Sequence, residues 1–61
     1  QNRLAKNENL VYASVDSRPR HLEEVAASCG LSMPECMEAL LKLELAGLIF
    51  GTGNQYYKKA E

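Results

Sequence analysis

Apolar side chains recur at helical spacing in three stretches of the chain, and two short strand-like runs follow them. The first stretch is expected to start at Asn7 as an N-cap and places four residues on one helix face: Leu10, Val11, Ser14 and Val15. Pro19 cannot continue a helix and ends this element. Residues 1–7 are largely polar and aperiodic, which predicts the end of a flexible linker, and Arg20 with His21 predicts a short extended link.

The second and third helical stretches are joined by a turn with strong capping signals. Apolar positions within residues 22–26 mark the second helix, and Gly30 is expected to end it in the left-handed conformation. Ser32 and Glu35 have the spacing of a capping box, and Pro34 suits the first turn of a helix because that turn lacks hydrogen-bond partners anyway. These signals predict a helix-turn-helix.

The third helix is predicted over residues 33–46, with Gly47 ending it. Its inward face carries Cys36, Leu40 and Leu43. Leu41 and Leu45 lie toward the outer face, where a simple amphipathic pattern does not require leucine. Two interpretations remain open: these leucines bind a partner, or they pack on the first helix or under the following strands.

Two strands, residues 48–50 and 55–58, are predicted around a glycine-rich loop, residues 51–54. The fold class is therefore mainly α with a small β-hairpin: a winged helix-turn-helix of three helices plus a wing. We expect the domain to cover residues 8–59, with residues 60–61 as a tail. Tyr56 and Tyr57 alternate faces in a strand, which predicts one buried and one exposed ring.

The length of 61 residues allows one small domain and no catalytic scaffold. Hydrophobic residues at 46% and charged residues at 25% are typical of a folded chain. Neither a membrane-spanning run nor a signal peptide is evident, and the absence of an initiator Met suggests a fragment of a larger protein. Because no catalytic constellation or phosphate loop is present, we predict that the chain is not an enzyme.

Two cysteines, Cys29 and Cys36, are too few for a disulfide scaffold, and His21 alone does not complete a zinc site with them. We therefore predict no metal and no cofactor. The thiols are expected to be reduced and mostly buried, as in a cytoplasmic protein.

Seven Lys and Arg residues against eight Asp and Glu residues give a net charge of −1. The acidic residues are concentrated on the second and third helices, while the basic residues lie mainly before them and in the wing. The second helix of a helix-turn-helix reads the major groove with its N-terminal residues. Here those positions include Glu35 and Glu38 and no Arg, Asn or Gln, so the sequence argues against sequence-specific readout.

Residues 18–58 resemble the small C-terminal domain of the DNA-processing protein A family, also called DprA or Smf. A run with the sequence Leu-Glu-Leu-Ala-Gly-Leu is the most specific part of the resemblance. The matching positions are Pro19, Leu22, Glu24, Gly30, Leu31, Ser32, Leu40, Leu43, Glu44, Leu45, Gly47, Leu48, Gly53 and Tyr56. The wing departs from the family pattern, because Phe50, Gly51 and Thr52 replace a longer and often more basic stretch.

The resemblance implies a bacterial parent protein of natural transformation, or competence, that acts in DNA recombination. Such a parent binds incoming single-stranded DNA through a Rossmann-like domain and helps to load the recombinase. It also implies three possible partners for this accessory domain: the absent Rossmann-like domain, the recombinase or another transformation protein, and DNA bound weakly and non-specifically.

Two sets of candidate site residues follow from these hypotheses. The favoured set forms a protein-interaction surface: Met37, Glu38, Leu41 and Leu45. The alternative set supplies non-specific nucleic-acid contacts: Arg18, Arg20, His21, Lys42, Asn54, Gln55, Lys58 and Lys59. His21 is weighed mainly as a packing or turn residue.

Overall fold

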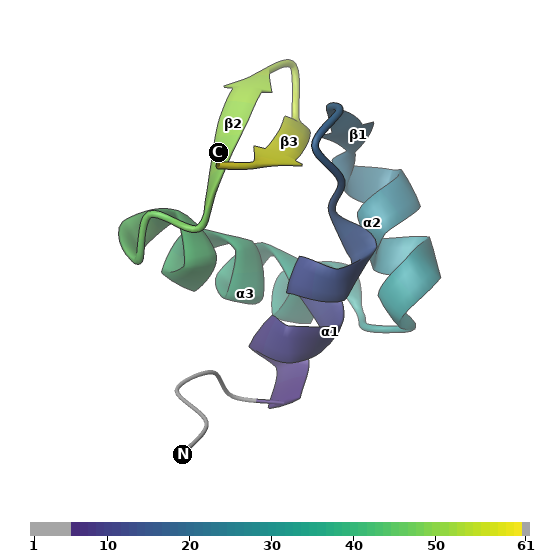
Figure 1. Ribbon diagram of the computed structural model, residues 1–61. Coiled ribbons are helices and arrows are strands. Elements are labelled where there is room, and N and C mark those ends of the chain that lie inside the picture. Colours follow the sequence, from purple (N-terminus) through teal and green to yellow (C-terminus); the bar gives the residue numbers. More distant parts are fainter. Residues whose placement is uncertain (1–5, 61) are drawn as a thin grey trace.

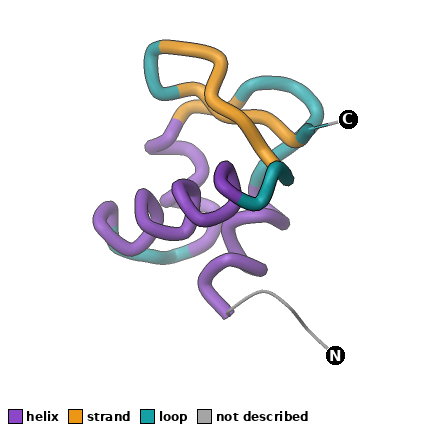
Figure 2. Tube along the Cα trace, turned by 90° about the vertical axis from the view of Figure 1, so that its left-hand side faces the viewer, coloured by secondary structure: helices purple, strands orange, loops and turns teal. Residues whose placement is uncertain are grey.

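Three helices and three short strands follow one another in the computed structural model, which describes residues 6–60 (Figure 1). In chain order the elements are α1 (Lys6–Ser14), β1 (Arg20–His21), α2 (Leu22–Cys29), α3 (Met33–Leu45), β2 (Ile49–Gly53) and β3 (Tyr56–Lys59). The strands lie together on one side of the helices (Figure 2). This mainly helical arrangement with a small antiparallel sheet confirms the predicted winged-helix fold class.

Helix α1 begins earlier than the sequence predicted. Asn7 is already within the helix, so its predicted role as the N-cap is wrong. The physical reason is tertiary contact: Lys42 Nζ of α3 lies 3.8 Å from Glu8 Oε2, and this ion pair holds the first turn of α1 in a way that local propensity does not encode. Of the predicted linker, residues 1–5 lie outside the described residues, as does residue 61 of the predicted tail.

The turn between α2 and α3 is capped as predicted. Gly30 has a φ of 73°, and its N–H donates to the Ala26 carbonyl at 3.0 Å. The Ser32 hydroxyl accepts from the Glu35 N–H at 3.3 Å, while the Glu35 carboxylate accepts from the Ser32 N–H at 3.1 Å. This confirms the capping box, which sets where α3 begins and how it leaves the turn.

The sheet has three antiparallel strands in the order β1-β3-β2, so the predicted extended link is paired as an edge strand. Its register places Arg20 opposite Tyr57 and His21 opposite Tyr56. The hairpin turn falls at Asn54 and Gln55, whose φ angles are 55° and 66°. The prediction of a loop over residues 51–54 is wrong, because the first three of these residues continue β2 with a register shift.

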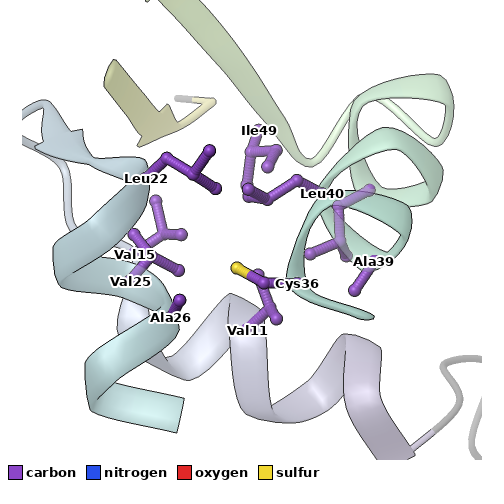
Figure 3. Close-up of a cluster of buried hydrophobic side chains, with 10 residues drawn as sticks. Val11, Val15, Leu22, Val25, Ala26, Cys36, Ala39, Leu40 and Ile49 are labelled. Atoms are coloured by element: carbon purple, nitrogen blue, oxygen red, sulfur yellow. The ribbon is translucent and has the colours of Figure 1, made fainter. Parts of the chain in front are cut away.

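The core lies where α1, α2, α3 and the base of the sheet meet (Figure 3). Its members are Val11, Val15, Leu22, Val25, Ala26, Cys36, Ala39, Leu40, Leu43 and Ile49. Tyr57 packs against this cluster and Tyr56 is 41% exposed, as strand alternation predicted. Leu10, expected on the buried face of α1, is 38% exposed instead.

Candidate functional site

The outward face of α3 carries a continuous row of exposed apolar side chains. Met33, Met37, Leu41 and Leu45 follow at four-residue intervals, with exposed fractions of 37%, 50%, 55% and 79%. Residues four apart on a helix are neighbours on its surface, so these four side chains form one strip along the helix. We call it the α3 apolar strip. The leucines are therefore neither packed on α1 nor covered by the hairpin.

The flanks of the α3 apolar strip are acidic, and the one basic residue of α3 is engaged in ion pairs. Lys42 Nζ lies 3.8 Å from Glu8 Oε2 and 3.6 Å from Glu38 Oε2. Glu44 Oε2 accepts from the Gly51 N–H at 3.1 Å, which ties α3 to the wing. Because Lys42 is paired and α3 contains no Arg, Asn or Gln, the helix offers no free cation or side-chain amide to the base edges of a duplex. The surface is therefore unsuited to major-groove readout.

Two of the residues predicted to contact nucleic acid, Arg20 and His21, interact with other groups of the domain at the start of α2. The Arg20 guanidinium donates to the Ser14 carbonyl at 2.9 Å, and its Nε lies 3.7 Å from Glu24 Oε1. His21 Nδ1 accepts from the Glu23 N–H at 3.1 Å and so caps the helix. His21 is therefore the N-cap of α2.

The two wing lysines lie over aromatic rings. Lys58 Nζ is 5.6 Å from the centroid of Phe50, and Lys59 Nζ is 4.5 Å from the centroid of Tyr12. Both lysines are half-buried. Such cation–π contacts hold the charges at defined places on the surface.

The structure does not gather the predicted nucleic-acid contacts into one basic face. The Lys42 side chain on α3 reaches toward Glu8 of α1, and the Lys59 side chain lies over the Tyr12 ring of α1. The Lys58 side chain instead lies over the Phe50 ring of the wing. Asn54 and Gln55 form the exposed hairpin turn. Among these candidates Arg18 is the cation that is exposed and outside the ion pairs and ring contacts of the described residues.

An exposed aromatic residue on the wing was missed by the sequence reasoning. Phe50 is 47% exposed, whereas its neighbour Ile49 is 2% exposed. The alternation of side chains along a strand could have revealed it, since a buried residue at position 49 places its neighbour on the outer face. With Tyr56 it gives the sheet two exposed aromatic rings.

The two cysteines are free thiols, with Cys36 in the core and Cys29 half-buried at the end of α2. Burial is the main reason that the pKa of Cys36 is raised to about 11, and the neighbouring Cys29 thiol adds to this increase. Burial also raises the pKa of Tyr57, and the nearby Glu44 carboxylate acts in the same direction. Cys36 is therefore a protonated core residue rather than a nucleophile.

A depression with a volume of about 390 Å³ separates the start of α1 from α3. Charged side chains of both signs line it, including Lys6, Glu8, Glu35, Glu38 and Lys42. The lining contains three carboxylates and two lysines, and Lys42 is paired with two of those carboxylates, so the depression offers no free cation from α3 to an anionic ligand. None of the helices formed by residues 6–60 has the length and apolar character needed to cross a bilayer.

Comparison with known proteins gives one match. The family model described as the DprA winged helix domain matches residues 1–52. Neither the curated proteins nor the solved structures contain a match to this chain. The predicted resemblance is confirmed by the family model, which covers all three helices and most of β2.

Proposed function

The chain belongs to the DprA winged helix domain family, and on that basis we propose that it is a non-catalytic accessory module that binds a protein or a neighbouring domain through the α3 apolar strip. The parent protein then acts in the cytoplasm of a bacterium during natural transformation. There it binds incoming single-stranded DNA through a Rossmann-like domain and helps to load the recombinase.

The exposure of the α3 apolar strip is the observation that carries this proposal. Leu41 and Leu45 are 55% and 79% exposed on α3, the second helix of the helix-turn-helix, which DNA-binding members of that class place in the major groove. Fully burying a leucine side chain stabilises a complex by about 1.5–3 kcal/mol. A row of four apolar side chains at four-residue spacing suits a partner that presents an apolar helix or groove.

The charges next to the strip favour a protein over DNA. Glu35, Glu38 and Glu44 would meet the phosphates of a duplex placed along α3. A partner protein with basic residues beside its apolar surface would instead pair with these carboxylates.

The alternative function, weak phosphate binding through the link and the wing, has less support. Arg20, Lys58 and Lys59 already contact groups within the domain. Releasing them for phosphates would break these contacts, so their contribution to affinity is reduced.

The test is a titration of the isotope-labelled domain with two purified proteins: the Rossmann-like domain of a DprA-family protein and the RecA recombinase. We expect amide shifts at the α3 apolar strip with one of them. Leu41→Glu should weaken that binding about tenfold or more, because a buried apolar contact is replaced by a charge.

The matched control is Ala27→Glu, which adds the same charge at an exposed position of α2. It should leave the affinity unchanged. Binding that survives Leu41→Glu, or shifts confined to α2 and the sheet, would contradict the proposal. Circular dichroism of Leu41→Glu should show the fold of the original chain, since the leucine is exposed.

A further inference from the structure

Carboxylates lie on both sides of the α3 apolar strip. We propose that the partner of the strip is a basic amphipathic helix, whose apolar residues pack along the strip while lysine or arginine residues beside them pair with Glu38 and Glu44. The inference rests on the proposed function and deepens it, because it names the chemistry of the partner.

Leu41 lies at the centre of this arrangement of charges. Glu38 comes three residues before it, and Glu44 comes three residues after it. A step of three residues turns about 60° around the helix axis, in opposite directions for the two glutamates, so they border Leu41 on opposite sides. Both glutamates and Leu41 are exposed. A partner that covers Leu41 therefore meets a negative charge on each side of the contact.

Glu44 is held in a fixed place on the surface. Its Oε2 accepts from the Gly51 N–H at 3.1 Å, which fastens the carboxylate to the wing. No lysine or arginine within residues 6–60 forms an ion pair with it. Glu44 also lies in the last turn of α3, where the helix dipole places a partial negative charge. A cation brought by a partner would be attracted by both the carboxylate and the dipole.

Glu38 can bind a second cation as well. Lys42 Nζ lies 3.6 Å from Glu38 Oε2 and also faces Glu8, so one lysine is shared by two carboxylates. The Glu38 side chain is 68% exposed. Exposed ion pairs of this kind contribute little to stability, so a partner's lysine or arginine can join or replace Lys42 at small cost.

The shape of the strip favours a helix as its partner. Four side chains at four-residue spacing form a ridge, and such a ridge packs into the groove between two rows of side chains on another helix. From Met33 to Leu45 the helix rises about 18 Å, which matches a partner helix of three to four turns. Because exposure increases from 37% at Met33 to 79% at Leu45, we expect the partner to cover mainly the second half of the strip.

A second copy of the chain fits this surface less well. If α3 of another copy packed on α3 around Leu41, its own Glu38 and Glu44 would lie beside the same residues of the first copy, in a parallel or an antiparallel pair. Like charges brought together across an interface oppose association. A basic helix instead satisfies the apolar and the acidic groups of the strip together.

The experiment uses two synthetic peptides of about 16 residues as probes of the full chain. Both carry four leucines at four-residue spacing on an alanine background that favours a helix. One has lysines on both sides of the leucine row, and the other has glutamates at the same positions. We expect the lysine peptide to shift the amide signals of α3 and to bind about tenfold more tightly than the glutamate peptide at low salt. High salt should narrow this difference, because it screens the charges.

Glu44→Gln tests the charge on the side of the domain. Glutamine keeps a side-chain oxygen that can accept from the Gly51 N–H, so the tie to the wing is retained. The variant should weaken binding of the lysine peptide about threefold to tenfold and should not weaken that of the glutamate peptide. The matched control is Glu23→Gln, which removes the same charge from an exposed position of α2 and should leave both affinities unchanged.

Leu41→Gln tests the apolar part of the contact without a change of charge. It should weaken binding of the lysine peptide about tenfold or more, because a buried leucine contact is lost. Circular dichroism checks that each variant is folded.

Several results would overturn the proposal. Equal affinities of the two peptides would do so, as would an unchanged affinity of the lysine peptide in Glu44→Gln. The same holds if neither peptide binds at about 1 mM, or if the amide shifts lie outside α3. Sedimentation that shows a dimer of the chain, dissociated by Leu41→Gln, would assign the strip to a second copy instead.

These outcomes differ from failure of the proposed function. If the peptide charges have no effect but the Rossmann-like domain or the recombinase still shifts α3, the strip binds a protein and only the basic character of the partner is wrong. If neither of those proteins shifts α3, the proposed function fails, whereas the two peptides still report which charge the strip prefers.

Discussion

Cys36 combines full burial with an ionisable side chain. It is 0% exposed and lies on α3, with its thiol directed into the core between α1 and α2 (Figure 3). The folded state disfavours the thiolate because the core offers no water to solvate it, and the pKa of Cys36 rises from 9.0 to about 11. In the unfolded chain the thiol keeps its ordinary pKa, so alkaline pH favours unfolding.

Alkaline destabilisation should therefore depend on Cys36. Its contribution is complete below pH 9.0 and is lost as the pH rises toward about 11, the pKa of the folded state. The size of the loss is on the order of 2 kcal/mol. Urea unfolding at about pH 8 and about pH 10.5 measures it in the original chain and in Cys36→Ala. We expect the variant to show a smaller decrease, and an equal decrease in both proteins would contradict this assignment.

The control is Cys29→Ala, which removes the other thiol. Burial is the larger cause of the Cys36 shift, so most of the alkaline decrease should persist in this variant. Tyr57 contributes in the same direction, because burial and the Glu44 carboxylate, the larger causes of its raised pKa, are kept in all three proteins. The comparison of variants at matched pH removes that shared part of the Tyr57 contribution.

The partners of the basic side chains show what could not be predicted at the scale of residues. Arg20 reaches the Ser14 carbonyl and Lys42 reaches Glu8, and both contacts join elements whose relative placement depends on the core. The sequence gives the number of cations but not which of them remain available. For this reason the basic residues predicted to contact nucleic acid do not lie together on one surface of the fold.

At the scale of elements, the predicted caps between α2 and α3 were confirmed, whereas the predicted N-cap at Asn7 and the predicted hairpin loop were not. The Ser32 capping box and the Gly30 turn were correct because each is set by a few adjacent residues. The hairpin turn was misplaced because glycines at 51 and 53 suggested a loop, whereas the turn uses Asn54 and Gln55. The pairing of β1 with β3 joins distant segments and left no local signal.

The hairpin turn offers a way to stabilise the wing. Positive φ at both central residues is typical of a type I′ turn, which favours Asn followed by Gly. Gln55, at φ 66°, is strained there, so Gln55→Gly should raise the free energy of unfolding by about 0.5–1 kcal/mol. Thermal and urea unfolding measure this change.

The hydrogen bond that Gln55 makes survives the substitution, since its backbone carbonyl accepts from the Leu22 N–H at 2.8 Å. Asn54→Ala serves as the opposite control: alanine is a poorer residue than asparagine for positive φ and should destabilise the hairpin. A lower stability of Gln55→Gly would mean that the glutamine side chain has a role that its exposed position does not suggest.

At the scale of the molecule, the net charge of −1 conceals a division between surfaces. Acidic residues border the α3 apolar strip, while the strands are free of them. One small domain thus presents an apolar strip with acidic flanks on α3 and a sheet whose charged residues are all basic. Both sets of exposed side chains lie on elements that the shared core holds in place.

The alternative function, phosphate binding through the link and the wing, predicts a weak salt dependence for oligo(dT) binding. Arg18 is exposed and Lys58 lies on the outer face, so about two cations contact phosphates, and the slope of log K against log salt should be near −1.4. A groove using six cations would give a slope near −4. Affinity measured between about 20 and 200 mM salt distinguishes these values.

One variant assigns the slope to its cause. Lys58→Gln should make the slope shallower by about 0.7, because one phosphate contact is lost. A slope near −2.8 in the original chain would instead mean that Arg20 and Lys59 also leave their contacts with Ser14 and Tyr12 to bind phosphates, because four cations would then contact the strand.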